Sequence, residues 1–125
     1  MKEQFCDYET SKKLKELGFD EECIAYYWAN KDTFHWIIPP AKDHNKLPTR
    51  ISIPTWQQVK QWIYGTYQAY IQLDFDNDGY YIASLVSEDG NWNFVLGNNK
   101  IHDYIEAENH AIQKSVEWLH ENIEK

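Results

Sequence analysis

Apolar residues recur at helical spacing in three parts of the chain, at residues 9–17, 55–67 and 103–122. The last segment carries the longest pattern, because its apolar positions follow one another at intervals of 7, 4, 3 and 4 residues. Such intervals place side chains on one face of an α-helix. The expected inward faces of the second and third helices comprise Trp56, Val59, Trp62, Ile63, Ile105, Ile112, Val116, Leu119 and Ile123. We therefore predict three amphipathic helices that turn these faces to a shared core.

The ends of these helices carry their own signals. Gly18 follows the first helix and suits the left-handed conformation that often closes one. Thr55 and Gln58 have the spacing of a capping box, in which each side chain accepts a hydrogen bond from the other residue's backbone N–H. Asp103 is placed to cap the third helix. Gly65 is expected to end the second helix.

Between the helices, short segments rich in aromatic and β-branched residues predict strands. These segments are residues 23–29, 34–38, 69–75, 80–86 and 92–96. Pro39 and Pro40 should end the second strand, because proline cannot donate to a sheet ladder. The turns DNDG and SEDGN are short, so the last three strands should form an antiparallel meander.

Together these elements predict one α+β domain over residues 1–125, in the order α-β-β-α-β-β-β-α. Helices should cover one face of a mostly antiparallel sheet of about five strands.

The segment from Pro39 to Pro54 exceeds the roughly 12–15 residues that a structureless loop usually reaches. It is either a mobile surface loop or a functional one. Glu108 falls inside the apolar stripe of the last helix, so it either lies at the edge of the stripe or is buried and paired.

Acidic and basic residues are distributed unevenly. Residues 1–73 contain 9 Lys or Arg and 9 Asp or Glu, whereas residues 74–125 contain 3 and 11, so the second part carries the whole net charge of −8. Such a surface repels phosphate, and Arg50 is the only arginine, so binding of nucleic acid is disfavoured. The acidic part could instead meet a basic partner or mimic nucleic acid. A solvated acidic helix and acidic turns explain the charge more simply.

The hydropathy of the chain bears on its compartment. No segment approaches the roughly 20 apolar residues that span a membrane, and the opening MKEQFCDYET lacks the apolar stretch of a secretory signal. We therefore expect no membrane association and a cytoplasmic protein. Cys6 and Cys23 should then stay reduced, and Cys23 is expected to be a small buried thiol of the core.

The segment DFDNDG resembles the first half of a calcium-binding loop, which has side-chain oxygens at alternate positions before a glycine. The residues concerned are Asp74, Asp76, Asp78 and Gly79. Leu85 stands where such a loop has its bidentate glutamate, and the flanking segments read as strands. A hairpin turn is therefore the preferred interpretation. The alternative is weak calcium binding, with Glu88 or Asp89 as additional ligands.

The histidines offer a second possible metal site. His102, Glu106 and His110 are spaced by four residues, so on a helix they would line up as metal ligands do. Their face is opposite the apolar stripe, and His102 precedes the expected start of the helix, so an exposed polar face is the preferred interpretation. His35 lies in a predicted strand with no second ligand near it in sequence.

Catalysis by a nucleophile has no support in the sequence, which contains no G-x-S-x-G, no family signature around either cysteine and no Gly-rich phosphate loop. Five histidines make chance pairings of Cys6 or Cys23 with His35 or His44 common. We therefore assign no catalytic residue, no metal ligand and no cofactor, and expect a protein that is not an enzyme. The alternative is a small metal-dependent enzyme that uses His35, His44 or the Asp74–Asp78 cluster.

Aromatic residues are more numerous than a core of this size requires, at 20 in 125 positions. Surplus Trp and Tyr are typical of interfaces or of platforms on which sugars stack. Strand alternation should turn Tyr26 and Trp28 to one face and Tyr27 to the other, and should separate Tyr80 from Tyr81 in the same way. Coverage of both sheet faces would absorb these rings by ordinary packing. A binding surface is the alternative.

Three segments carry a resemblance to known proteins: YETSKKLKELGFDEECIAYYW, PTWQQVKQWIY and DYIEAENHAIQKSVEWL. Together and in this order they resemble small proteins of unknown function from Bacteroides-type bacteria, their phages and mobile elements. That group shares an opening of the type LKELGFDE-C-YY, a P-T-W-Q-Q helix and a closing helix of the type YEEAE. The segment His102-Asp103-Tyr104 departs from the group, which often has Thr or Ser before this tyrosine.

The resemblance implies a fold, but no catalytic residue, no cofactor and no substrate. We therefore expect a non-enzymatic binding or accessory protein of a phage or mobile element that acts through an aromatic or acidic surface. Its partner would be an unidentified protein, and the chain itself a monomer or a weak homodimer.

Overall fold

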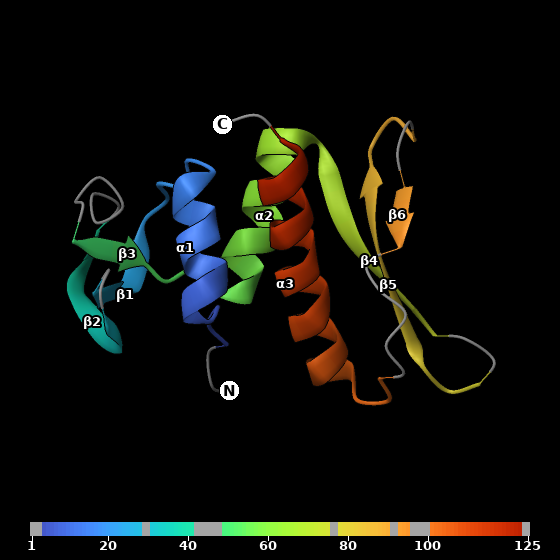
Figure 1. Ribbon diagram of the computed structural model, residues 1–125, viewed down its shortest axis with the longest axis horizontal. Coiled ribbons are helices and arrows are strands. Elements are labelled where there is room, and N and C mark those ends of the chain that lie inside the picture. Colours follow the sequence, from blue (N-terminus) through green and yellow to red (C-terminus); the bar gives the residue numbers. More distant parts are fainter. Residues whose placement is uncertain are drawn as a thin grey trace.

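The computed structural model describes residues 4–28, 31–41, 49–75, 78–90, 93–95 and 101–123. Its helices are α1 (Tyr8–Glu16), α2 (Trp56–Tyr67) and α3 (Tyr104–Asn122). Its strands are β1 (Cys23–Trp28), β2 (Lys31–Ala41), β3 (Arg50–Ser52), β4 (Ala69–Phe75), β5 (Tyr81–Ser87) and β6 (Asn93–Val95). The helices form a middle layer, with β1, β2 and β3 on one side of it and β4, β5 and β6 on the other (Figure 1). The expected α+β class is thus confirmed.

The expectation of a single sheet of about five strands is wrong. The strands form two antiparallel sheets, in the orders β2-β1-β3 and β4-β5-β6. The meander of the last three strands is confirmed. The sequence pattern does not predict β3, because it has only three residues and lies in the segment that reads as a loop. The observed order is α-β-β-β-α-β-β-β-α. The helices lie between the β1–β2 and β4–β5 hairpins, which the sequence pattern predicts to belong to one sheet.

The strand β2 continues through Pro39 and Pro40 to Ala41, so the prolines do not end it. Ala25 of β1 pairs with Trp36, whereas Cys23, two positions earlier, pairs with Ala41. The extra residues of β2 form a bulge that contains both prolines, and β2 is an edge strand. Proline is tolerated in both settings, because no ladder N–H is required there. Residues 42–48 of the expected loop lie outside the described residues.

The ends of α1 follow the expected chemistry. Gly18 has a φ of 95°, the left-handed conformation predicted for it. Its N–H bonds the carbonyl of Lys15, and the N–H of Phe19 bonds the carbonyl of Leu14, which together form a Schellman motif. Asp7 caps the start of the helix, since its carboxylate accepts a hydrogen bond of 2.8 Å from the N–H of Thr10.

The start of α2 confirms the predicted capping box. The hydroxyl of Thr55 accepts from the N–H of Gln58 at 3.2 Å, and the Gln58 side chain accepts from the N–H of Thr55 at 2.9 Å. The expected end at Gly65 is wrong, because α2 continues to Tyr67 and closes at Gln68, whose φ is 52°. A helix tolerates an internal glycine at a cost of about 1 kcal/mol relative to alanine, so a single glycine does not suffice to stop it.

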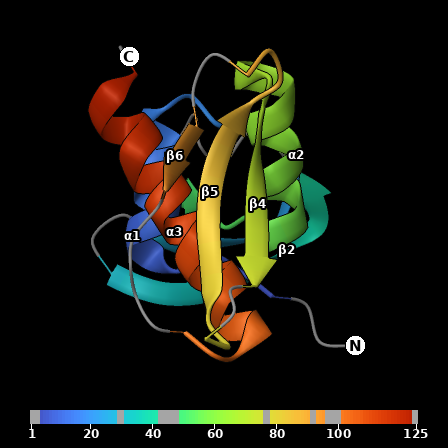
Figure 2. The ribbon, with the colours of Figure 1, turned by 90° about the vertical axis from the view of Figure 1, so that its right-hand side faces the viewer.

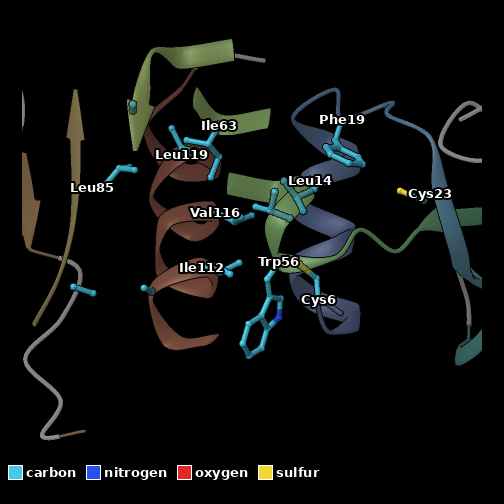
Figure 3. Packing of buried hydrophobic residues seen from close by; sticks show 14 residues of the cluster. Cys6, Leu14, Phe19, Cys23, Trp56, Ile63, Leu85, Ile112, Val116 and Leu119 are labelled. Atoms are coloured by element: carbon cyan, nitrogen blue, oxygen red, sulfur yellow. The ribbon is translucent and has the colours of Figure 1, made fainter. Parts of the chain in front are cut away.

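The core lies among the three helices and extends to the strands on either side (Figure 3). The predicted inward residues that are buried are Trp56, Val59, Ile63, Ile112, Val116 and Leu119, and those that are half-buried against the core are Trp62 and Ile123. Figure 3 shows side chains of α2 and α3 directed toward Leu14 of α1. Phe19 and Cys23 extend the same cluster toward β1. The periodicity therefore identifies most of the core.

Ile105 is the exception, because its side chain is 52% exposed. It lies in the first turn of α3. The inward positions that follow are occupied by Ala107, Ala111 and Ser115, all buried and spaced by four residues. Small side chains allow α3 to approach α1, α2 and the β4–β6 sheet closely. The spacing of large apolar residues does not reveal this stripe of small residues, and it wrongly places Ile105 in the core.

Polar contacts fix α3 against its neighbours. Lys60 Nζ of α2 lies 2.7 Å from Glu108 Oε1 of α3, and the Glu108 side chain is only 15% exposed. Of the two alternatives for Glu108, the structure thus shows the paired one, with the side chain partly buried. Gln113 donates to Asp7 Oδ2 at 2.8 Å, and His120 Nε2 lies 2.8 Å from Glu16 Oε2, so two side chains of α3 hold α1.

Among the described helices, none has the length and hydropathy that crossing a bilayer requires.

Candidate functional site

An aromatic patch lies where the β4–β5 hairpin meets the start of α3. It consists of Phe75, Tyr81 and Tyr104, and the exposed Ile105 follows Tyr104 in α3. The ring centroids of Phe75 and Tyr81 are 4.9 Å apart, and those of Tyr81 and Tyr104 are 5.7 Å apart, both in edge-to-face geometry. Phe75 is 62% exposed and Tyr104 is 51% exposed. Large apolar side chains are thus left in contact with solvent at one place on the surface, beside one another.

The backbone explains why these residues meet. Phe75 and Tyr81 are cross-strand partners at the ends of β4 and β5. The N–H of Tyr81 also donates to the carbonyl of Ile101 at 2.9 Å, which brings the segment before α3 alongside β5. Figure 2 shows the start of α3 next to this end of β5. Residues distant in sequence therefore form one surface.

His102 reinforces this junction. Its Nδ1 lies 2.9 Å from the carbonyl oxygen of Gly79, and because a carbonyl only accepts, Nδ1 carries the proton. Its ring also packs on Tyr80, with centroids 4.2 Å apart. The side chain of Asp103 accepts from the N–H of Glu106 at 2.9 Å and so confirms the predicted N-cap. The patch is therefore supported by hydrogen bonds on both sides.

Among the residues that the structure describes, the charged side chains next to the patch in sequence are acidic. Residues 69–90 and 101–113 contain no lysine or arginine. The exposed carboxylates next to the patch in sequence are Asp74, Asp103 and Glu106, and Asp78 lies in the turn between β4 and β5. Lys60, which reaches this part of α3 from α2, is paired with Glu108. A ligand that approaches the patch therefore meets apolar rings beside negative charge.

Other aromatic residues pack on the β1–β3 sheet. Trp36, 60% exposed, contacts Phe5 and Phe34 with ring centroids 5.9 and 5.0 Å away. On the opposite face, the Arg50 guanidinium lies 4.9 Å from the Tyr26 ring and 5.2 Å from the Trp28 ring. The predicted separation of Tyr26 and Trp28 from Tyr27 is consistent with these contacts, since Tyr27 packs against Tyr8 and Phe34. Ordinary packing accounts for most of these rings.

The residues considered as metal ligands are not brought together in the described parts of the chain. No group of three or more His, Cys, Asp or Glu side chains there is arranged to hold a metal ion. Asp74 is exposed on β4 and accepts from Gln72 at 3.1 and 3.2 Å, and Asp78 is exposed in the following turn. Asp76 and His44 lie outside the described residues.

The remaining histidine candidates have other partners. His102 precedes α3, as expected, and bonds Gly79, so it does not share a helical face with Glu106 and His110. His35 pairs with Tyr26 across β1 and β2, and their rings stack with centroids 5.3 Å apart. Each ring therefore has a structural role in the fold.

Cys6 and Cys23 are free thiols, both buried. Burial raises the pKa of the Cys6 thiol far above its usual value, and the charge of Asp7 adds to this effect. Burial, with Glu21 and Glu22 nearby, raises the pKa of Cys23 to about 12. A nucleophilic cysteine needs a lowered pKa and access to solvent, and these thiols have neither. The expected buried thiol at position 23 is thus confirmed.

Sequence reasoning does not single out Phe75, Tyr104 or Ile105 as surface residues. One signal was available for Phe75, which stands between carboxylates in DFDNDG, where a core residue would be unusual. Tyr104 directly follows the helix cap, a position that lies beyond the packed turns. The sequence contains no comparable signal for Ile105.

Comparison with known proteins adds no assignment. No protein-family model, no curated protein and no solved structure matches this chain.

Proposed function

We propose that this chain is a non-enzymatic binding protein whose aromatic patch docks a basic segment of a partner protein. The observation that carries the proposal is the exposure of Phe75 and Tyr104, each more than half accessible to solvent and each in ring contact with Tyr81. Exposed apolar residues scattered singly need no explanation, whereas a contiguous patch with a polar rim is typical of an interaction site.

The chemistry of the patch favours a cationic and partly apolar partner. Tyr and Phe rings attract the guanidinium of Arg and the ammonium of Lys through their quadrupoles, with about 0.5–2 kcal/mol per contact. They also bury large apolar areas at the centres of interfaces. Phe75 and Tyr104 present both properties at one place.

The surrounding charge supports the same partner. Asp74, Asp78, Asp103 and Glu106 give this part of the surface a negative potential, and such a potential accelerates the encounter with a basic surface and disfavours an acidic one. The proposal thus combines the aromatic and the acidic surfaces that the sequence indicates. An accessory role in a phage or mobile element rests on the resemblance described above.

The test uses two sets of fluorescein-labelled peptides. One set alternates Lys or Arg with Leu or Phe, and a matched set replaces Lys and Arg by Asp and Glu. Fluorescence anisotropy should show binding of the basic set, with an affinity that falls as salt is added. The double variant Phe75→Ser/Tyr104→Ser should bind at least about tenfold more weakly, since it removes the two exposed rings. Its melting temperature should remain close to that of the unmodified chain, because these rings are exposed.

Tyr70→Ser is the matched control, because Tyr70 is an exposed aromatic residue of β4 that lies outside the patch. It should bind as the unmodified chain does. Equal binding of the acidic peptides, or unchanged binding by the double variant, would contradict the proposal. A thermal shift of several degrees with Ca²⁺, Mn²⁺ or Zn²⁺ alone would instead favour the metal-dependent alternative at the Asp74–Asp78 turn or at His35 and His44.

A further inference from the structure

A groove runs between the C-terminal half of α2 and the segment that precedes β1. It has a volume of about 520 Å³. The C-terminal half of α2 lies at the opposite end of the helical layer from the start of α3 (Figure 1). The residues of α2 that line it are Gln58, Gln61, Trp62, Gly65 and Thr66, and the opposite wall contains Glu21 and Glu22. The α2 residues recur at intervals of three and four, so they form one face of the helix. The volume is within the range of small-molecule sites.

Gly65 in this groove has no structural explanation. It lies inside α2, where glycine is less favourable than any residue except proline. Its φ is not in the left-handed region, unlike that of Gly18, Gly79 and Gly90. A Cβ built on Gly65 would meet no atom within 4 Å, so no neighbour requires the absence of a side chain. Glycine at such a position allows a ligand to approach the helix backbone closely.

Trp62 forms the aromatic part of the groove. Phe19 and Tyr67 hold its ring in edge-to-face contact, with centroids 5.4 and 5.6 Å away. Gln58 stabilises the opposite wall, because its amide donates to the carbonyl of Glu22 at 2.6 Å. The groove therefore has an aromatic ring in a fixed position, one helical turn or less from the uncovered backbone at Gly65.

The polar groups around Trp62 restrict the ligand. The carboxylates of Glu21 and Glu22 repel anions, and the amide of Gln61 and the hydroxyl of Thr66 are poor surroundings for a purely apolar molecule. Carboxylates accept hydrogen bonds, whereas amides and hydroxyls both donate and accept. A neutral polyhydroxyl ligand satisfies all of them, and the apolar face of a sugar ring can pack on an indole.

We infer that this groove binds a sugar unit of a neutral carbohydrate, which stacks on Trp62 and approaches the α2 backbone at Gly65. The site is independent of the aromatic patch, so either proposal can fail alone. A basic peptide drawn to Glu21 and Glu22 is the competing ligand, and the test separates the two.

The test is an NMR titration of the ¹⁵N-labelled chain with neutral hexasaccharides of glucose, N-acetylglucosamine and mannose, and with oligolysine. At least one saccharide should shift the Trp62 indole N–H and the Gly65 amide, with an affinity that 0.5 M NaCl leaves unchanged within about twofold, because no charge is neutralised. Absence of a shift with every saccharide would overturn the inference. Binding of oligolysine alone, lost in salt, would do the same.

Gly65→Ala is the decisive variant. Its methyl group occupies the floor of the groove and favours the helix, so the melting temperature should rise by about 2–5 °C while saccharide affinity falls at least about tenfold. Gln57→Ala, on the exposed part of α2 outside the groove, should leave saccharide affinity unchanged. If Gly65→Ala raises the melting temperature and binds saccharide as before, the glycine has no role in binding and the inference is wrong.

Discussion

Lys60 and Glu108 connect two helices through an ion pair of 2.7 Å between Nζ and Oε1. Glu108 lies within the apolar stripe of α3, and its carboxylate is mostly shielded from water, whereas Lys60 is about one third exposed. The stem of a lysine can pack along apolar surface while its ammonium reaches a charged partner. The pair thereby accommodates a carboxylate on a helix face that otherwise packs inward.

Removal of one partner should therefore cost more than removal of both. We expect Lys60→Met to lower the free energy of unfolding by about 1–2 kcal/mol, because the Glu108 carboxylate then loses its cation. The double variant Lys60→Met/Glu108→Leu should lie closer to the unmodified chain. Urea denaturation measures both. Glu117→Ala is the control, since the Lys114–Glu117 pair is exposed and longer, at 3.5 Å, and should change stability by less than about 0.5 kcal/mol.

Ile105 and Ile112 test the position of the core. Ile112 is buried, so Ile112→Ala should lower the free energy of unfolding by about 2–5 kcal/mol. The same substitution at Ile105, which is half exposed, should cost less than about 1 kcal/mol. Thermal denaturation of the two variants compares them directly. Equal losses would mean that α3 is rotated relative to its orientation in this structure.

Asp7 combines two roles in one carboxylate, since Oδ1 caps α1 and Oδ2 accepts from Gln113 of α3. Asp7→Ala should lower the free energy of unfolding by about 1–2 kcal/mol, because it removes the cap as well as the contact between helices. Gln113→Ala removes only that contact and should cost about 0.5 kcal/mol. Similar losses for the two variants in urea denaturation would argue against a contribution from the cap.

The raised pKa of Cys23 predicts an alkaline loss of stability. The folded chain holds the thiol proton up to a pKa of about 12, whereas the unfolded chain releases it near 9.0. The folded state therefore binds more protons between these values, and its stability falls as the pH rises through this window and is fully present below it. Relative to Cys23→Ala, the unmodified chain should lose about 1 kcal/mol per pH unit above pH 9.

The measurement is the difference in free energy of unfolding between the two chains at pH 8, 10 and 11 under reducing conditions. The tyrosines and lysines common to both chains cancel in this difference. A difference that does not depend on pH would show that the thiol ionises equally in both states.

How far the sequence predicted the structure depends on the range of each interaction. The capping box at Thr55, the left-handed Gly18 and the cap at Asp103 are set by neighbours three or four residues away, and all three are confirmed. The stripe of α3 is confirmed from Ile112 onward for the same reason. These features need no information from the rest of the chain.

The failures concern long-range relations. Whether the hairpins share an edge depends on where the helices pack, and the strand β3 exists only because β1 offers it an edge. The partner of Glu108 is 48 positions away in sequence, so the choice between its two predicted states requires the fold. The aromatic patch has the same character, since Tyr81 reaches Tyr104 only through the bridge to Ile101. No local pattern contains these pairings.

The contacts of α3 with α1 bear on how the chain folds as it is synthesised. Asp7 and Gln113 are 106 positions apart, and Glu16 and His120 are 104 apart. The first helix is therefore synthesised long before α3, its packing partner. Until α3 is present, the apolar face of α1 that packs against it stays exposed to solvent or is bound by a chaperone. Contacts of such sequence separation slow folding and prolong exposure to aggregation. The contacts between α1 and α3 in the middle layer can form only after residue 120 has been synthesised.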